Sequence, residues 1–265
     1  MVWWQAMVLG IVQGLTEFLP VSSSGHLILV RELMGLNIGV NAQFNLMFDV
    51  TAHLGTLIAV VIVLYKPILE LFKKPFKKLL LLVIATIPAV VVGFVFKDYI
   101  EQYFSTATYL CFFFLFTAII MLVSEIVAKR NRKPKDLSYG GAIAMGVMQG
   151  IGVFPGVSRS GSTIFGGTLA GTDTKKVATF SFLMSIPVIL GSLLLSVIDV
   201  AQAGTLAQID WFSIFVGMAS AFASGYIAVR VMLALVAKAN FKWFSLYLLV
   251  ISILTFAFYF IPSLA

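Results

Sequence analysis

The chain has 265 residues, of which 60% are hydrophobic and 11% are charged, with a formal net charge of +7 at pH 7. Ordinary soluble domains carry about 25% charged residues, so this composition excludes a water-facing surface of the usual kind. Nucleic acid is not indicated, because the basic residues lie in short stretches between apolar runs and not along one soluble face. The composition predicts a single-domain, all-α polytopic membrane protein.

The chain begins with an apolar stretch, residues 2–36, that Pro20 and a run of Ser and Gly interrupt near its middle. Each half of this stretch is too short to cross about 30 Å of hydrocarbon. We therefore expect a re-entrant hairpin whose non-helical tip is buried in protein, where its backbone groups find partners. Three uninterrupted apolar runs follow, and we predict that they cross the membrane as helices: residues 46–65, 79–96 and 107–128.

A second interrupted stretch, residues 139–171, repeats the pattern of the first. The sequence GIVQG at residues 10–14 aligns with GVMQG at 146–150, and VSSSG at 21–25 aligns with VSRSG at 157–161. Three further spans follow: residues 177–198, 211–236 and 243–261. A hairpin followed by three crossings leaves the second hairpin on the opposite face. The halves, residues 1–128 and 139–265, are therefore expected to form an inverted-topology repeat with a site where the two tips meet.

The charge of the loops predicts the orientation of the chain. One face carries 14 of the 18 Lys and Arg residues, whereas Arg31 and Lys97 lie near the other face. By the positive-inside rule the basic face is cytoplasmic, so both termini and the first tip face outward from the inner membrane. The basic residues are Lys66, Lys73, Lys74, Lys77, Lys78, Lys129, Arg130, Arg132, Lys133, Lys135, Lys175, Lys176, Lys238 and Lys242.

Ionisable side chains at membrane depth are costly and are candidates for function. Glu17 and His26 flank the first tip, and Arg159 lies in the second, so the inverted repeat is expected to bring them together. For Arg159 the alternative is an ion pair with Glu17 that only locks the hairpins. For His26 the alternative is a structural hydrogen bond to a loop carbonyl. Asp49 and His53, four residues apart at the entry of the first span, either line the mouth of the pocket or lie at the membrane interface, and the interface is favoured.

The polar groups of the two tips suit phosphate binding. Arginine forks onto phosphate oxygens, while hydroxyls and helix N-terminal amides donate hydrogen bonds to them. The alternative for individual serines is that they cap the following helices. The pattern itself assigns Gln13, Gln149, Gly14 and Gly150 to helix packing. The candidate hydroxyls are Ser22, Ser23, Ser24, Ser158, Ser160 and Thr163.

Residues 13–26, QGLTEFLPVSSSGH, and residues 155–161, PGVSRSG, resemble the two motifs of the undecaprenyl pyrophosphate phosphatases linked to bacitracin resistance. The resemblance implies hydrolysis of undecaprenyl diphosphate to the monophosphate and phosphate at the outer membrane face, which recycles the carrier lipid for peptidoglycan. It also implies a divalent cation, Mg²⁺ or Ca²⁺. Glu17 matches the essential glutamate, as base or metal ligand, and Arg159 would clamp the diphosphate.

Gln13 matches a position that is often a second glutamate in the family, and it is therefore a candidate substrate-binding residue. A neutral amide is a poorer ligand for Mg²⁺ or Ca²⁺, so the metal is expected to be held mainly by the substrate phosphates. The nucleophile is either Ser23 or water. An activated serine would need Glu17 or His26 within hydrogen-bond reach.

The main alternative is a lipid flippase or secondary transporter, because paired broken helices in an inverted repeat also suit alternating access. No chain of intramembrane charges leads from the tips to the cytoplasmic side, which favours the hydrolase. The expected partners are the polyprenyl diphosphate and membrane lipids. Gly191, Gly217 and Gly225 offer close-packing surfaces for a homodimer.

Overall fold

The structure is a computed structural model that describes residues 1–36, 42–96, 99, 100, 103, 107–131, 133–203, 210–236 and 238–261. Of the residues considered above, Lys97, Arg132 and residues 262–265 lie outside the described part. The described chain is helical, with one isolated β-bridge between Lys135 and Thr172. The helices are α1 Trp3–Phe18, α2 Ser23–Leu33, α3 Ala42–Val63, α4 Tyr65–Leu71, α5 Lys77–Val95, η1 Ala107–Tyr109, α7 Leu110–Arg130, α8 Tyr139–Ile151, α9 Arg159–Leu169, α10 Thr174–Ala203, α11 Trp211–Val236 and α12 Lys242–Phe260.

Six helices of the described residues are long and apolar enough to cross a membrane, and they fall on the six predicted spans. They are α3, α5, the η1–α7 segment, α10, α11 and α12. Each predicted interrupted stretch is a pair of shorter helices joined by a turn, α1 with α2 and α8 with α9. The predicted span 46–65 runs past the end of α3 into α4, and α10 extends beyond the predicted end at 198.

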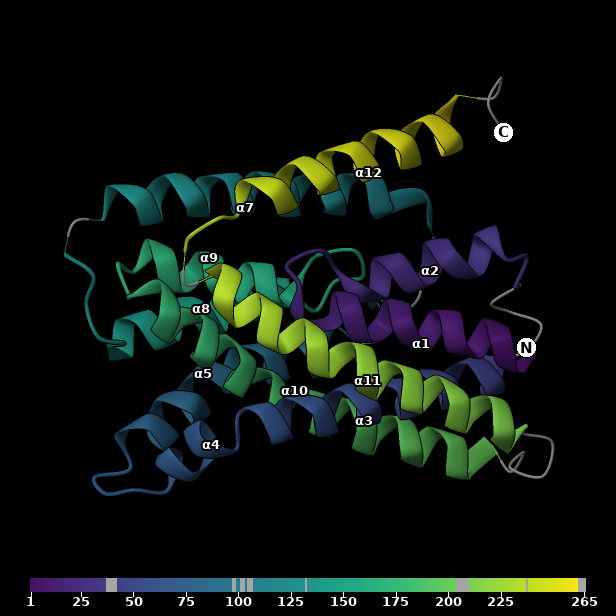
Figure 1. Ribbon diagram of the computed structural model, residues 1–265, viewed down its shortest axis with the longest axis horizontal. Helices are drawn as coiled ribbons and strands as arrows, with labels where there is room; N and C mark the ends of the chain where they lie inside the picture. Colours follow the sequence, from purple (N-terminus) through teal and green to yellow (C-terminus); the bar gives the residue numbers. More distant parts are fainter. Residues whose placement is uncertain are drawn as a thin grey trace.

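The two short pairs enter the bundle from opposite ends (Figure 1). The helix α1 begins at the end of the molecule where α12 finishes, and α8 begins at the other end, near α4. The helix α1 packs on α11, and α8 packs on α5, while α7 and α12 lie side by side along one edge. The turns of the two pairs therefore meet between the ends of the bundle.

Glycines allow the close approach of these helix pairs. A Cβ on Gly14 would clash with Ser224 and Ala221 of α11, and a Cβ on Gly146 would lie 2.6 Å from the carbonyl oxygen of Ala85 in α5. Backbones that approach this closely gain van der Waals contact, which drives helix association in lipid. The assignment of Gly14 to packing is thus confirmed, with a spanning helix as its partner.

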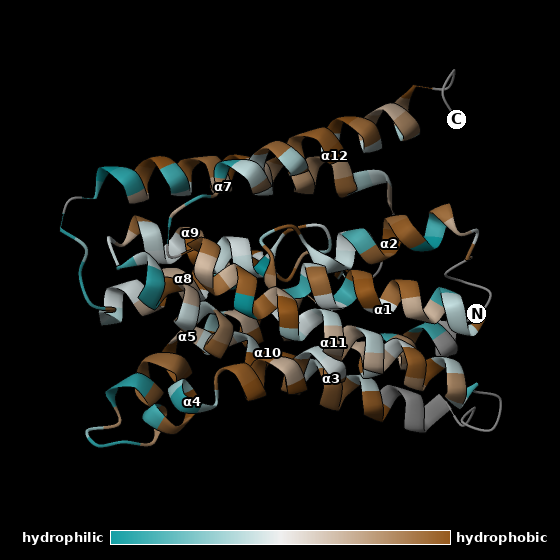
Figure 2. Ribbon diagram, in the orientation of Figure 1, coloured by the Kyte–Doolittle hydropathy of each residue, from teal (hydrophilic) through white to brown (hydrophobic). Residues whose placement is uncertain are grey.

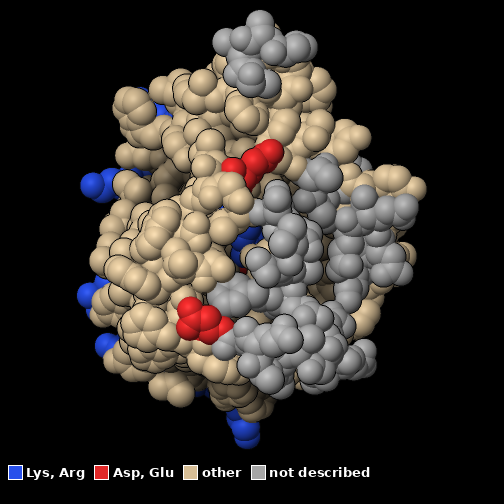
Figure 3. Space-filling model, turned by 90° about the vertical axis from the view of Figure 1, so that its right-hand side faces the viewer, with Lys and Arg blue, Asp and Glu red and all other residues tan. Residues whose placement is uncertain are grey.

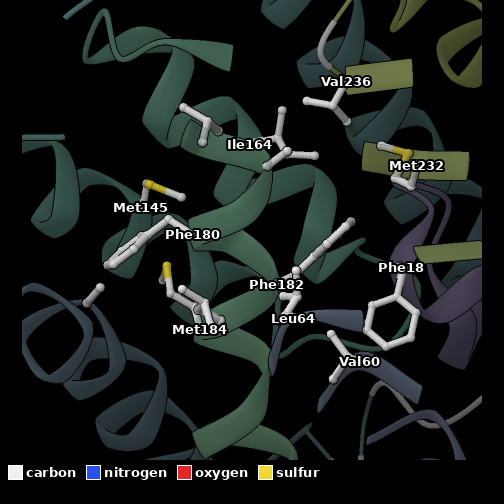
Figure 4. Packing of buried hydrophobic residues seen from close by; sticks show 14 of the residues in the cluster. Phe18, Val60, Leu64, Met145, Ile164, Phe180, Phe182, Met184, Met232 and Val236 are labelled. Carbon is white, nitrogen blue, oxygen red and sulfur yellow. The ribbon is translucent and has the colours of Figure 1, made fainter. Parts of the chain in front are cut away.

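Phe18 anchors the end of α1 in the largest buried cluster (Figure 4). Its ring meets Phe182 of α10 edge to face, with centroids 5.5 Å apart, and Val60 of α3 lies in the same cluster. Ile164 of α9 and Met232 of α11 extend the cluster, which therefore joins both halves of the chain. Because Phe18 follows Glu17, this packing fixes the position of the glutamate.

Basic loops gather at one end of the bundle. Lys176 at the start of α10 forms an ion pair with Asp136, and Lys77 at the start of α5 lies over the ring of Tyr139 in α8. These two contacts join the loops before α5, α8 and α10. Hydrophilic residues mark the same end, around α4 and the end of α7 (Figure 2). At the opposite end, where α1 begins, the Lys and Arg residues that are described and visible lie inside a hollow and along the outline (Figure 3).

Candidate active site

The turns of the two helix pairs have similar local structure. Ser22 caps α2 by accepting a hydrogen bond from the Gly25 amide at 3.3 Å, and Ser158 caps α9 by accepting one from the Gly161 amide at 3.1 Å. Ser22 has a positive φ of 69°, and Gly156 has a φ of 90°. A positive φ at serine is uncommon and concentrates at functional turns. The alternative stated for individual serines, that they cap the following helices, is confirmed for Ser22 and Ser158.

The two turns are bonded directly to each other. The Ser24 hydroxyl accepts from the Gly156 amide at 3.3 Å, and the Ser160 hydroxyl donates to the Leu19 carbonyl at 2.9 Å. A Cβ on Gly25 would lie 3.2 Å from the Cα of Gly156, so these backbones are close enough to touch. The two tips, far apart in sequence, therefore form one structural unit.

Glu17 is the centre of the polar groups in this unit, although its side chain is buried. Its Oε1 accepts from Arg159 Nη2 at 2.7 Å, and its Oε2 accepts from Ser23 Oγ at 2.7 Å and from Gln13 Nε2 at 3.0 Å. The pairing of Glu17 with Arg159 compensates the cost of burying both charges. One carboxylate thus contacts residues from both tips.

A pocket of about 150 Å³ opens beside Glu17. Three serines of the first tip line it, together with Ser158, Arg159 and His53, and Val188, Ile189 and Ser192 form a wall from α10. Ser22 and Ser24 are joined by a hydroxyl pair at 3.3 Å, which leaves further hydrogen-bonding capacity on both. The pocket is therefore polar on the side of the tips and apolar on the side of α10.

The two terminal nitrogens of the Arg159 guanidinium differ in their hydrogen bonding. Nη2 binds Glu17, but Nη1 is buried and has no hydrogen-bond partner among the described residues. An unsatisfied buried guanidinium nitrogen is costly, so a group that accepts its hydrogen bonds would be held firmly. The arrangement suits an anion with several oxygens, such as a phosphate.

Four of the predicted site residues do not line the pocket. Gln13 contacts it only through Glu17, and the Ser160 hydroxyl is used between the tips. Thr163 is fully buried, where its hydroxyl bonds the Arg159 carbonyl and the Ser181 hydroxyl. These side chains hold the lining residues in place.

His26 is the fourth, and both of its ring nitrogens are engaged. Nδ1 donates to the Ser22 carbonyl at 2.7 Å, since a carbonyl can only accept. Nε2 therefore accepts from the Tyr247 hydroxyl, also at 2.7 Å, and the two rings stack. The alternative stated for His26, a structural hydrogen bond to a loop carbonyl, is therefore the contact that the structure shows.

His53 lines the pocket, which is the less favoured of the two positions expected for it. Its Nε2 is 3.8 Å from Glu17 Oε2, and its side chain is 31% exposed. Asp49, one turn earlier on α3, instead pairs with Arg31 of α2. In the sequence, the signal for His53 was the presence of a histidine within an apolar run. Its spacing of four residues from Asp49 did not decide its position, because such a pair is equally expected at the end of a span.

Known proteins resemble this chain along nearly its whole length. Residues 6–254 match the model of the family described as bacitracin resistance protein BacA. The undecaprenyl-diphosphatase of Carboxydothermus hydrogenoformans is 41% identical over 251 residues, 94% of each chain. That of Halothermothrix orenii is 38% identical over 253 residues, 94% of this chain and 95% of the relative. Undecaprenyl-diphosphatase 4 of Bacillus cereus is 41% identical over 259 residues, 97% of this chain and 98% of the relative. The chain therefore belongs to the BacA family of bacitracin resistance proteins.

Proposed function

We propose that the chain hydrolyses undecaprenyl diphosphate to undecaprenyl phosphate and inorganic phosphate, which recycles the lipid carrier of cell-wall synthesis and gives resistance to bacitracin. The observation that carries this proposal is that Arg159, whose buried Nη1 has no hydrogen-bond partner among the described residues, lines a pocket together with serine hydroxyls. Both features complement phosphate oxygens. The names of the relatives support the same substrate.

The pocket accommodates the diphosphate and not the prenyl chain. Its volume of about 150 Å³ is small, and Val188 and Ile189 form its apolar wall. Arg159 clamps a phosphoryl group through Nη1, and the Ser22–Ser24 hydroxyl pair donates to its oxygens through the one hydrogen that is not used between the two serines. The prenyl chain leaves past the apolar wall into lipid.

Ser23 is the proposed nucleophile, because its hydroxyl donates to Glu17 Oε2 at 2.7 Å. Its Oγ attacks the terminal phosphorus while its proton passes to Glu17, and the bond to the bridging oxygen breaks to release prenyl monophosphate. The departing monophosphate takes that proton from Glu17. Water then attacks the phosphoserine, its proton passes through Glu17 to Ser23 Oγ as the bond between Oγ and phosphorus breaks, and phosphate leaves. His26 acts as a positioning residue by holding the Ser22 carbonyl.

A divalent cation would be held jointly by Glu17 and the diphosphate. The carboxylate oxygens of Glu17 are ligands of the kind that Mg²⁺ and Ca²⁺ take, and the amide Oε1 of Gln13, which is buried and has no hydrogen-bond partner among the described residues, is a poorer one. The described residues contain no cluster of three or more His, Cys, Asp or Glu that would hold such an ion alone. When bound, the cation would neutralise charge on the phosphate oxygens.

The site is proposed to lie within the inner membrane and to open outward. The α1–α2 and α8–α9 pairs act as re-entrant hairpins of an inverted repeat, residues 1–128 and 139–265. In support, corresponding helices make corresponding contacts: α1 packs on α11, as α8 packs on α5. The basic loops at the end opposite the start of α1 support a cytoplasmic position for that end.

Phosphate release in detergent tests this function. The purified chain is mixed with undecaprenyl diphosphate in micelles, where no second compartment exists, and inorganic phosphate is measured. Hydrolysis predicts steady release over many turnovers. A flippase or secondary transporter, the alternative that an inverted repeat also permits, predicts no release in micelles but movement of the lipid across vesicle membranes.

A further inference from the structure

His53 is held in one orientation from the far side of its ring. Its Nδ1 donates to the Asp49 carbonyl at 2.7 Å, since a carbonyl oxygen can only accept. The Asp49 side chain is in turn paired with Arg31 of α2, which fixes this part of α3. Nε2 of His53 is the nitrogen that faces the pocket.

This arrangement places two acceptors in front of each other. With its hydrogen on Nδ1, the neutral imidazole presents a lone pair on Nε2, and Glu17 Oε2 lies 3.8 Å away. Metal-binding histidines characteristically donate their other ring nitrogen to a carbonyl or carboxylate, as His53 does. Two atoms bound to one ion at about 2.1–2.4 Å are at most about 4.2–4.8 Å apart. The separation therefore allows a single ion to bind both atoms, in place of one of the two hydrogen bonds that Glu17 Oε2 accepts from Ser23 and Gln13.

We propose that His53 Nε2 is a ligand of the divalent cation that enters with the diphosphate, beside Glu17. This inference rests on the proposed function for the identity of the anion. A nitrogen ligand favours a transition metal such as Mn²⁺ over Ca²⁺, which takes oxygen ligands. His26 cannot serve in this way, because both of its nitrogens are engaged by Ser22 and Tyr247.

The chain is well suited to a spectroscopic test, because it has two histidines. The full chain in detergent is loaded with Mn²⁺ and methylenediphosphonate, a diphosphate analogue that is not hydrolysed. Pulsed electron paramagnetic resonance then detects imidazole nitrogen coupled to the bound ion. We expect this coupling in the parent and in His26→Gln, and we expect its loss in His53→Gln.

The affinity for Mn²⁺ in the presence of the analogue should also fall, by at least about tenfold in His53→Gln. Gel filtration checks that each variant is folded. Because His53→Gln retains His26, loss of the nitrogen coupling in folded His53→Gln assigns the ligand to His53 without the need for the His26→Gln variant. Coupling that survives in His53→Gln, or that is absent from the parent, overturns the proposal. If His53 only forms an ion pair with Glu17, the parent chain should show no nitrogen coupling.

The outcome is separate from that of the proposed function. A parent chain that releases phosphate but shows no nitrogen coupling refutes the role of His53 and leaves hydrolysis in place. If the parent chain shows the coupling but releases no phosphate, the metal site is supported and the proposed hydrolysis is refuted.

Discussion

At the scale of single residues, one carboxylate connects the parts of the site. Glu17 accepts hydrogen bonds from Arg159, Ser23 and Gln13, and His53 faces it across 3.8 Å. A structural ion pair would need only Arg159. The contact with Ser23 adds a base beside a hydroxyl, which is the arrangement that nucleophilic catalysis requires.

Glu17→Gln should reduce kcat by roughly 10², because the amide keeps the size of the side chain but cannot take the proton of Ser23. Substrate affinity should change less, since Arg159 and the tip hydroxyls remain. Steady-state phosphate release and equilibrium binding of the prenyl diphosphate measure the two effects separately. An unchanged kcat would remove Glu17 from the chemistry.

Tyr247→Phe tests the structural role of His26. Loss of the hydroxyl leaves the buried Nε2 of His26 without a donor, which should cost about 1–3 kcal/mol of stability. The unfolding temperature in detergent should fall by several degrees. The control is Tyr226→Phe, since Tyr226 of α11 contacts its neighbours through its ring and should tolerate loss of the hydroxyl. Equal effects of the two changes would mean that the bond to His26 adds nothing.

The sequence predicted the residues of the site better than their contacts. Glu17 and Arg159 stood out because isolated charges are rare at membrane depth. His53 was placed at the interface because spacing along one helix does not reveal which neighbour that helix face meets. Thr163 looked like a phosphate ligand, but its hydroxyl is used by Arg159 and Ser181 inside the bundle.

At the scale of helices, glycine placement explains the pairing. Gly14→Ala should destabilise the chain by about 1–3 kcal/mol, because the added methyl clashes with Ser224 and Ala221 of α11. The matched control is Gly93→Ala, where no atom lies within 4 Å of the added Cβ. Thermal unfolding in detergent measures both. A Gly14→Ala variant as stable as Gly93→Ala would show that α1 and α11 can separate without cost.

The long helices were predictable from length and hydropathy, and the interrupted pairs from Gly, Pro and Ser. The short helix α4 was not, because a helix of 7 residues has little stability of its own and forms through its neighbours. The end of α10 also lay beyond the prediction. Hydropathy predicts which residues cross the hydrocarbon core, but it does not predict the residue at which the helix ends.

At the scale of the whole molecule, the prediction of a homodimer loses part of its basis. Of its three glycines, Gly217 is closed in by Phe48 and Gly225 by Thr56, both of α3, whereas Gly191 has open space around it. Two of the three surfaces are thus used within the chain. A homodimer stays a prediction that rests on Gly191.

The proposed outward orientation predicts which cysteines a reagent can reach. In a Cys111→Ser background, Asp210→Cys should react in intact spheroplasts with a maleimide that cannot cross membranes. Lys133→Cys, at the basic end, should react only after lysis. The opposite pattern would place the basic loops outside and invert the proposed topology.

The pocket between the two tips is proposed to hydrolyse the diphosphate with Arg159 as its clamp. The most direct test of this claim compares kcat/KM for phosphate release by Arg159→Lys with that by Arg230→Lys, the same substitution on α11, where Arg230 lies over the ring of Tyr226. A lysine cannot supply two planar donors, so Arg159→Lys should lose about 10- to 100-fold or more, with the chain still folded. Arg230→Lys should stay within about threefold of the parent. Near-normal turnover by Arg159→Lys, or equal losses in both variants, would contradict the claim.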